Sequence, residues 1–188
     1  KKWTPETPNR YQLIVRIRYQ GHFTEYIPYM VGFRKLEMKD GRYCLNDRPV
    51  EFRGAEYNFS CITPDDKTIR AEFAKLKQEK FNAVKCTYHP RQNRVYELCG
   101  ELGLWVYDEV NTDTQLTGEQ LQVGGTLANA PAWVDAYLKR VENAWRFSRN
   151  HTPTALFSIG KGPGSGYNTY KSYLLLKALE ANRPVLYE

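Results

Sequence analysis

Apolar and polar residues alternate along the first part of the chain. Leu13, Val15 and Ile17 recur at every second position, which is the period of a strand with one buried face. Gly21 and Asp40-Gly41 are turn residues that separate such stretches. The pattern predicts antiparallel β-structure, with strands over 10–19 and 23–31, an extended segment over 32–38, and a hairpin of 42–45 with 49–53.

From about residue 50 the pattern changes to strands that alternate with helices. Ile69, Phe73 and Leu76 recur at helical spacing after a helix start at 64–66. Such alternation predicts right-handed βαβ units around a parallel sheet. The predicted strands are 50–53, 81–86, 104–107, 155–159 and 184–187, and the later helices are 91–101, 131–149 and 167–180.

The order of these elements favours one α/β architecture over another. No Gly-x-Gly-x-x-Gly motif follows the first strand of the alternating part, which argues against a dinucleotide-binding fold. We therefore predict a partial (β/α)8 TIM-type barrel of about five strands and four helices. Antiparallel strands precede it.

Composition and charge narrow the classes of partner. With 41% hydrophobic and 14% aromatic residues, the chain of 188 residues is globular rather than disordered. The net charge of +6 is not gathered into a basic block, so we expect no nucleic-acid partner. No apolar run approaches the roughly 18–20 residues of a membrane span. No signal peptide opens the chain, and we expect no membrane partner and a cytoplasmic or periplasmic location.

The four cysteines do not form a metal-binding pattern. Cys44, Cys61, Cys86 and Cys99 lack Cys-x-x-Cys spacing, and most lie in apolar stretches. We expect buried thiols rather than a zinc site.

A glycine-rich turn within 155–168 is the most informative segment, because an apolar strand enters it and a helix leaves it. Parallel α/β enzymes place catalytic side chains at such strand ends, yet the polar side chains of this turn are Lys161 and Ser165, without a carboxylate. The glycines suit a plain strand-to-helix turn, a phosphate cradle at a helix N-terminus, or a catalytic turn that has lost its carboxylate. Nucleotide-binding loops end in Gly-Lys-Ser/Thr before their helix, and here the lysine comes first.

Short motifs along the chain carry a resemblance to a known family. They include Trp-Thr-Pro-Glu-Thr-Pro-Asn at 3–9, Val-Gly-Phe-Arg-Lys at 31–35, Phe-Asn-Ala-Val at 81–84, Asp-Glu-Val-Asn at 108–111 and Arg-Pro-Val-Leu-Tyr-Glu at 183–188. In their order and spacing these motifs are similar to family 2 glycoside hydrolases, the bacterial β-galactosidases. The resemblance covers essentially the whole chain.

The resemblance implies a domain division and a mechanism. Residues 1–40 would be the last strands of an immunoglobulin-like sandwich, and 41–188 the first half of a (β/α)8 catalytic barrel. Family members use a glutamate acid/base after the fourth barrel strand and a glutamate nucleophile after the seventh, as retaining hydrolysis requires. The family's Gly-Asn-Glu turn reads Gly160-Lys161-Gly162 here, so Gly162 occupies the acid/base position. With the fifth strand as its last, we expect this chain to hold neither catalytic glutamate.

Other pocket positions also differ from the family motifs. Arg-Gly-Val-Asn-Arg-His-Glu reads Arg-Gly-Ala-Glu-Tyr-Asn-Phe at 53–59, and Ser-His-Tyr-Pro-Asn reads Thr-Tyr-His-Pro-Arg at 87–91. In well-known members a glutamate and a histidine after the third strand bind magnesium together with the acid/base, and those positions hold Asp113, Gln115 and Gly162 here. We therefore expect no cofactor and no metal. The resemblance assigns substrate binding to Asn58, His89, Glu109, Asn111, Asp113 and Lys161.

Plain structural roles compete with functional ones at several of these positions. Histidine beside proline is commonly packed or exposed rather than a ligand, and aromatic residues at helical spacing are commonly core. These positions are His89, the pair Asp108-Glu109, and the stripe of Trp133, Trp145 and Phe147. For Asp108-Glu109 the structural alternative to the floor of a substrate pocket is a pair that orders a loop.

The sequence thus predicts a β-galactosidase-like fragment that is inactive by itself and binds carbohydrate at most weakly. The alternative is a non-catalytic carbohydrate-binding or structural remnant that pairs with another polypeptide. A nucleotide- or phosphate-binding protein comes third. We also expect the turn around Lys161 to attract an anion such as sulfate.

An open five-stranded sheet leaves exposed edges. Barrel-facing apolar side chains such as Val84, Val106 and Phe157 would also lack cover. Whichever way the strands alternate, we expect some residues of a larger apolar set to face solvent: Phe52, Val84, Leu104, Val106, Phe157 and Ile159. Self-association or binding to a complementary fragment follows from that expectation.

Overall fold

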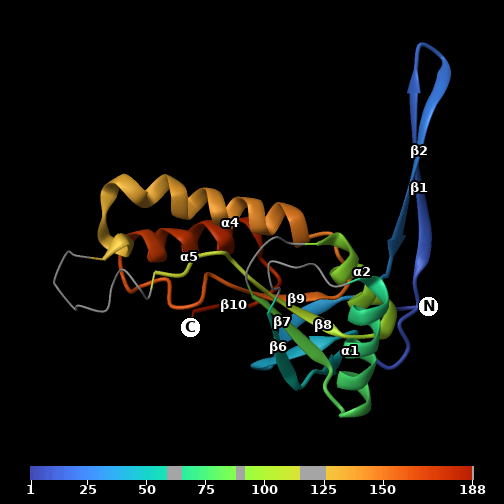
Figure 1. Ribbon diagram of the computed structural model, residues 1–188, viewed down its shortest axis with the longest axis horizontal. Helices are drawn as coiled ribbons and strands as arrows, with labels where there is room; N and C mark the ends of the chain where they lie inside the picture. The colour runs from blue at the N-terminus through green and yellow to red at the C-terminus, as the bar shows by residue number, and fades with distance from the viewer. Residues whose placement is uncertain (59–64, 88–91, 115–125, 188) are drawn as a thin grey trace.

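The computed structural model describes residues 1–58, 65–87, 92–114 and 126–187 (Figure 1). Within these residues the strands form three sheets. A two-stranded ribbon consists of β1 (Tyr11–Tyr19) and β2 (His22–Val31), and a small antiparallel sheet consists of β3 (Leu36–Lys39), β4 (Arg42–Leu45) and β5 (Arg48–Pro49).

The third sheet is parallel and has the strand order β10-β9-β8-β7-β6. Helices connect its successive strands, so the predicted fold class, a partial TIM-type barrel after antiparallel strands, is confirmed. Its elements are β6 (Gly54–Asn58), α1 (Asp66–Gln78), β7 (Ala83–Thr87), α2 (Asn93–Leu102), β8 (Trp105–Glu109), α4 (Val134–Ser148), β9 (Thr154–Ser158), α5 (Tyr167–Leu179) and β10 (Val185–Leu186).

The first parallel strand begins later than the apolar pattern predicts. Residues 50–53 were expected as that strand, but the strand is Gly54–Asn58. The side chain of Asn82 accepts from the Arg53 amide at 2.8 Å and donates to the Glu51 carbonyl at 2.7 Å. These side-chain bonds hold the segment before β6 in place of a strand ladder.

Helix ends follow the local sequence closely at two places. Asp65 caps α1 because its carboxylate accepts from the Thr68 amide at 2.7 Å. Gly103 ends α2 with a φ of 72°, in the left-handed region that favours glycine. Pro131 does not open the long helix as predicted; it begins a 3₁₀ turn, Pro131–Trp133, and α4 follows at Val134.

The side of the sheet that faces the helices carries the residues expected inside the barrel. Val84, Val106 and Phe157 are fully buried, the first two against α1 and α2 and the third against α4 and α5. The expectation that they lack cover is wrong because strand alternation has the opposite phase. The concave face instead presents Lys85, Tyr107 and Leu156, among others.

Cys44, Cys86 and Cys99 are buried and not disulfide-bonded, as expected, and Cys61 lies outside the described residues. The three aromatic residues of the predicted helical stripe differ in burial. Trp145 and Phe147 pack on the core, as the structural interpretation requires, whereas Trp133 is 42% exposed.

The N-terminal segment closes the end of the sheet where its parallel strands begin. Trp3 is fully buried, donates from Nε1 to the Gly100 carbonyl at 2.8 Å, and packs edge-on against Trp105 with ring centroids 4.7 Å apart. Leu36 and Leu45 of the small sheet belong to the same cluster. This cluster joins the antiparallel part of the chain to the parallel sheet.

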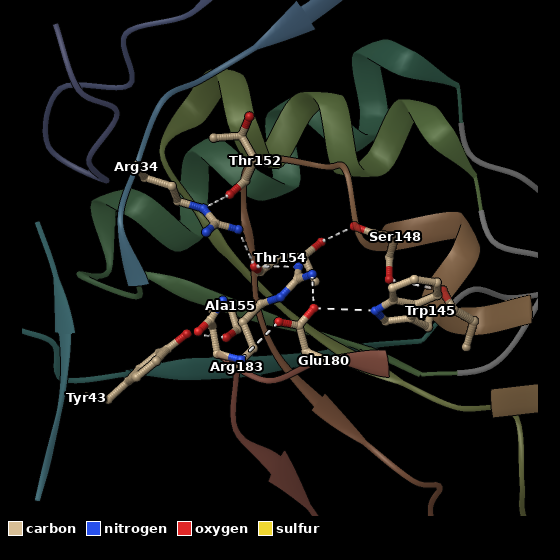
Figure 2. Close-up of polar contacts among 11 residues, drawn as sticks. Arg34, Tyr43, Trp145, Ser148, Thr152, Thr154, Ala155, Glu180 and Arg183 are labelled. Atoms are coloured by element: carbon tan, nitrogen blue, oxygen red, sulfur yellow. Dashed lines mark hydrogen bonds and ion pairs between the residues drawn. The ribbon is translucent and has the colours of Figure 1, made fainter. Parts of the chain in front are cut away.

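A buried polar network makes the second junction, as Figure 2 shows. The Arg34 guanidinium donates to the carbonyls of Thr152 and Thr154, the latter at 2.6 Å. Arg183 donates to the same Thr154 carbonyl at 3.4 Å and forms an ion pair with Glu180. Burial and the neighbouring Arg183 lower the pKa of Arg34 to about 10. Two guanidiniums, those of Arg34 and Arg183, and one carboxylate, that of Glu180, therefore lie close together near the start of β9.

The β1–β2 ribbon extends away from the rest of the chain (Figure 1). Its large apolar side chains are exposed, among them Leu13 at 49%, Ile14 at 48% and Tyr26 at 56%. A two-stranded ribbon is marginal by itself in water. The assignment of residues 1–40 to a sandwich domain, with the barrel from 41 onward, stays a prediction.

Candidate functional site

The carboxyl ends of the parallel strands meet at one edge of the sheet, which is where the motif positions lie. Residues on the concave face follow the two-residue strand period: Gly54 and Glu56 on β6, Ala83, Lys85 and Thr87 on β7, and Trp105, Tyr107 and Glu109 on β8. The residues of each series that lie nearest the carboxyl end of its strand are polar or charged: Glu56, Lys85, Thr87, Tyr107 and Glu109. We refer to this edge and its side chains as the mouth of the sheet.

An ion pair crosses the mouth between the two strands that lie three steps apart. The Lys161 Nζ, in the turn after β9, lies 2.7 Å from Oε1 of Glu56 on β6. Neighbouring strands are about 4.8 Å apart, so β6 and β9 are separated by roughly 14 Å along the sheet. The curvature of the sheet lets the two side chains bridge that span. Lys161 holds the pKa of Glu56 below its usual value.

A second ion pair lies on the same face between adjacent strands. Lys85 Nζ is 2.9 Å from Oε2 of Glu109, and both side chains are largely buried. The Lys85 ammonium also lies 5.3 Å from the centroid of the Tyr107 ring. The Thr87 hydroxyl, on the same strand as Lys85, donates to the Glu56 carboxylate at 3.4 Å.

Asp108 and Glu109 point to opposite sides of the sheet, because they are neighbours on one strand. Asp108 is buried on the helix side and accepts from the Tyr96 hydroxyl of α2 at 2.9 Å. Glu109 faces the mouth. One residue of the pair thus has a structural contact and the other lies among the charged groups of the candidate site.

The glycine-rich turn after β9 is fastened to the segment after β8. The Gly162 carbonyl accepts from the Thr114 amide and hydroxyl, both at 3.2 Å. Gly160 has a φ of 143°, and a Cβ there would lie 2.3 Å from the Thr112 carbonyl oxygen. Gly162 has a φ of 57°. The turn therefore requires glycine at position 160. Gly162 brings no side chain to the mouth.

The structure places the six residues predicted to bind substrate as follows. Lys161 and Glu109 lie at the mouth, each within an ion pair. Asn111 and Asp113 are exposed in the segment after β8. Asn58 ends β6, but its side chain lies outside the described residues, as does His89. Their role in substrate binding stays a prediction.

Sequence reasoning missed two partners, Glu56 and Lys85. Glu56 was recorded only as a departure from a motif asparagine. Its place two residues after Gly54 and two before Asn58 would have put it on the same strand face as the predicted Asn58. Lys85 is a lone charge in an otherwise apolar strand, which is itself a signal because a buried lysine requires a partner.

The magnesium ligands that the family resemblance implies do not fit the residues present. Asp113 offers an exposed carboxylate, Gly162 has no side chain, and Gln115 lies outside the described residues. Across the part of the chain that the structure describes, no three His, Cys, Asp or Glu side chains form a group able to hold a metal ion. No helix of that part is long and apolar enough to cross a membrane.

A cavity of about 260 Å³ lies on the concave face. Lys85, Tyr107 and Trp105 line it together with apolar residues. Trp105 is almost fully buried, and its indole N–H has no hydrogen-bond partner among the described residues. Aromatic rings with a polar edge and one charged group are a combination that can hold a small polar ring.

Comparisons with known proteins agree on the fold. Over 98% of this chain the structure is similar to a beta-glucuronidase of Ruminococcus gnavus, with a TM-score of 0.83, 18% identity and 33% of that chain covered. A beta-glycosidase of Bacteroides vulgatus matches 99% of this chain with a TM-score of 0.78, 22% identity and 24% of its own length covered. At these identities the likeness shows the fold.

Sequence comparisons identify the family. A beta-galactosidase of Vibrio vulnificus (strain YJ016) is 35% identical to the chain over 194 residues, and one of Pseudoalteromonas haloplanktis is 35% identical over 196 residues. The match covers 100% of this chain and 18% of each relative, so the chain spans about a fifth of their length. The sequence model for the TIM barrel domain of glycosyl hydrolases family 2 matches residues 36–188. The chain therefore belongs to glycosyl hydrolase family 2.

Proposed function

We propose that these residues derive from a retaining glycosidase acting on terminal β-D-galactosides, and that the 188-residue chain does not itself catalyse the reaction. The relatives named beta-galactosidase support the substrate class. The observation that carries the inactivity is Gly162 in the turn after β9, where the resemblance places the acid/base glutamate. The mouth offers Lys161 and Glu56 there, already paired with each other.

The loss of the acid and the loss of the nucleophile have different signatures. A missing general acid typically costs 10²–10⁴-fold in rate, but an activated leaving group such as dinitrophenolate hardly needs protonation. A missing nucleophile removes the covalent route for every substrate. A chain that lacks only the acid would therefore still turn over an activated galactoside.

The test uses dinitrophenyl β-D-galactoside with the purified chain, with and without azide as an external nucleophile. We expect no release of dinitrophenolate above the background rate and no galactosyl azide. Gly162→Glu restores the carboxylate at the acid position and should also remain inactive, because the nucleophile is still missing. Turnover that survives repurification and follows the protein through a second column would contradict the proposal.

A second candidate function is non-catalytic carbohydrate binding, and the cavity on the concave face favours it. The unpaired indole N–H of Trp105 and the Tyr107 ring border a space below the roughly 300–1,000 Å³ of sites for drug-sized ligands. That size suits one sugar ring. We expect methyl β-D-galactoside to bind weakly, with saturation transfer from aromatic protons of the protein to the sugar that Trp105→Phe reduces. Equal transfer in the variant would exclude this cavity as the site.

We further propose that the chain pairs with itself or with a complementary polypeptide. The parallel sheet ends at β6 and β10 within the described residues, and edges of this kind template pairing. Beside β10, the helix α5 exposes Tyr167, Tyr170 and Leu174. Light scattering should show a mass above that of the monomer. A compact monomer that binds no hydrophobic dye would contradict this proposal.

A further inference from the structure

A groove lies at the end of the parallel sheet where the strands begin, opposite the mouth. It has a volume of about 620 Å³, within the roughly 300–1,000 Å³ of small-molecule sites. One wall consists of residues from 2–7 and the other of residues from 45–51. Asn82, just before β7, and the almost fully buried Trp105, which begins β8, also line it. We call this space the amino-end groove.

Each wall of the amino-end groove carries one cation and one carboxylate. Lys2 and Glu6 belong to the wall of residues 2–7, and Arg48 and Glu51 belong to the opposite wall. All four residues are exposed, and none of their side chains forms an ion pair or a hydrogen bond with another described residue. Charges of both signs are therefore available to a ligand, and complementarity favours a ligand that carries both signs.

The two cations lie toward one end of the groove, because a hydrogen bond joins the walls there. Asn46, in the turn between β4 and β5, donates from Nδ2 to the Trp3 carbonyl at 3.2 Å. Lys2 precedes Trp3, and Arg48 begins β5 just after the turn. The bond therefore brings the backbones at Lys2 and Arg48 to the same end of the groove, on opposite walls.

The two carboxylates lie toward the other end, beside the parallel strands. The Asn82 side chain donates to the Glu51 carbonyl at 2.7 Å, and the Asn82 carbonyl accepts from the Trp105 amide at 2.7 Å. The Pro5 carbonyl, next to Glu6, packs beside residue 103, two positions before Trp105. The backbones at Glu6 and Glu51 are thus both held near Trp105, and the groove has a positive and a negative end.

A longer peptide added as a strand suits this groove less well. β5 is an edge of the small antiparallel sheet, and its residues Arg48 and Pro49 line the groove. Proline has no N–H to donate to a further strand. Recognition at this edge therefore depends on charged groups rather than on a ladder of backbone hydrogen bonds.

We propose that the amino-end groove binds a dipeptide with apolar side chains in its zwitterionic form. The dipeptide carboxylate lies between Lys2 and Arg48, its ammonium lies between Glu6 and Glu51, and its apolar side chains pack on the lining at Trp105. A ligand of this class supplies both charges across an apolar body, which a neutral sugar does not. This site depends on neither the proposed glycosidase origin nor carbohydrate binding at the concave face, although Trp105 borders both spaces.

The test titrates leucyl-leucine into the isotope-labelled 188-residue chain and follows the tryptophan indole N–H signals by NMR, assigned with Trp105→Phe and Trp145→Phe. We expect weak binding, with a dissociation constant on the order of 1 mM, and a shift of the Trp105 signal. The signal of Trp145, on α4, should not shift. N-acetyl-leucyl-leucine lacks the ammonium and leucyl-leucinamide lacks the carboxylate. Each should bind about two- to fivefold more weakly, in line with the strength of exposed ion pairs.

Two variants assign each charge of the ligand to its end of the groove. Glu51→Gln removes one carboxylate of the negative end, so N-acetylation of the ligand should weaken binding less in this variant than in the unmodified chain. Arg48→Gln removes one cation of the positive end, and amidation should likewise have a smaller effect there. The crossed combinations, acetylation with Arg48→Gln and amidation with Glu51→Gln, should be additive. In about 1 M salt, where the Debye length is about 3 Å, these differences should shrink.

Glu142→Gln is the control for a change of net charge alone. It removes a carboxylate from the exposed surface of α4, where Glu142 pairs with Lys139 and Arg146, and it should leave every affinity unchanged. Circular dichroism of each variant checks that the fold is retained.

Three results would overturn the proposal of a zwitterion site. The Trp105 signal does not respond to leucyl-leucine, the acetylated and amidated ligands bind as tightly as the free dipeptide, or Glu142→Gln weakens binding as much as Glu51→Gln does. Coupling that appears only in the crossed combinations would overturn the proposed placement of the ligand charges.

Discussion

Glu180 is the residue whose loss should damage the fold most, because it is the one carboxylate of the network at the start of β9 (Figure 2). It pairs with Arg183, accepts from the Trp145 indole at 3.4 Å, and accepts from the Asn182 amide at 3.3 Å. Arg34 and Arg183 share the Thr154 carbonyl. Glu180→Gln keeps an acceptor oxygen for the neutral donors and removes the charge that offsets the two guanidiniums.

The magnitude follows from burial. The side chains of Glu180 and Arg183 are 10% and 9% exposed, so water does not replace the lost charge. Breaking a buried pair by removing one partner costs about 3–5 kcal/mol. Because glutamine keeps part of the hydrogen bonding, we expect a loss of about 3 kcal/mol in the free energy of unfolding. For a chain of this length that corresponds to about 6–12 °C in Tm.

Urea unfolding at neutral pH, followed by circular dichroism and tryptophan fluorescence, measures this loss. Glu142→Gln is the matched control, since it removes a carboxylate from exposed pairs and should cost at most about 0.5 kcal/mol. Arg34→Met in the Glu180→Gln background removes one of the two facing cations. The double variant should therefore lose less than the sum of the single variants, by about 0.5–3 kcal/mol.

Two results would refute this reasoning. Glu180→Gln as mild as Glu142→Gln would mean that the network carries no net stability. Strict additivity with Arg34→Met would mean that Arg34 and the Glu180 carboxylate do not interact. The network also predicts a pH dependence, because the pKa of Glu180 is lowered by Arg183 against the effect of burial. Its contribution is present above the ordinary carboxyl pKa of about 4.3 and is lost as the pH falls through the lower folded pKa.

Two further predictions concern single positions. Gly103→Ala should destabilise the chain by more than about 1 kcal/mol, since a Cβ there would lie 2.1 Å from the Pro5 carbonyl oxygen. Gly41→Ala is the control, because Gly41 has a φ of 73° but open space around it, so that this variant has the backbone strain without the clash. Equal losses of the two variants in urea unfolding would exclude the clash. Burial lowers the pKa of His151, whose ring lies 4.8 Å from that of Tyr96. The free energy of unfolding should therefore fall as the pH drops below about 6.5, the pKa of histidine in the unfolded chain. His151→Gln should remove this pH dependence.

The sequence was sufficient for the element order, and the structure explains why. Asp65 and Gly103 determine helix ends through bonds and dihedral angles that their side chains, or lack of one, impose locally. The strand-to-helix turn at 160–166 is similarly local. Strand phase was not predictable for the buried strands, because β7, β8 and β9 are covered by helices on one face and are rich in apolar residues throughout. The wrong assignment of Val84, Val106 and Phe157 to the interior follows from that.

The candidate site was predicted position by position but not as a set of contacts. Lys161 and Glu109 were identified from motif positions, whereas their partners Glu56 and Lys85 belong to other strands, and pairing between strands far apart in the sequence depends on curvature. The buried network of Arg34, Glu180 and Arg183 was not predicted either. Arg34 lies about 150 positions from Glu180 and Arg183, and no local pattern connects it to them.

Stability and candidate chemistry occupy opposite ends of the parallel sheet. Trp3, Arg34 and Glu180 make buried contacts at the end where the strands begin. Loss of Trp3 would leave a cavity, loss of Arg34 would remove its hydrogen bonds to the Thr152 and Thr154 carbonyls, and loss of Glu180 would leave Arg183 without its ion-pair partner. At the mouth, by contrast, the Glu56–Lys161 pair is partly in solvent, and Gly162 bonds to Thr114 through its backbone carbonyl alone. A substitution at the mouth should therefore cost the fold less than loss of the Glu180 carboxylate at the other end. This asymmetry predicts that a family 2 barrel fold tolerates changes at the mouth more readily than changes at the end where the strands begin.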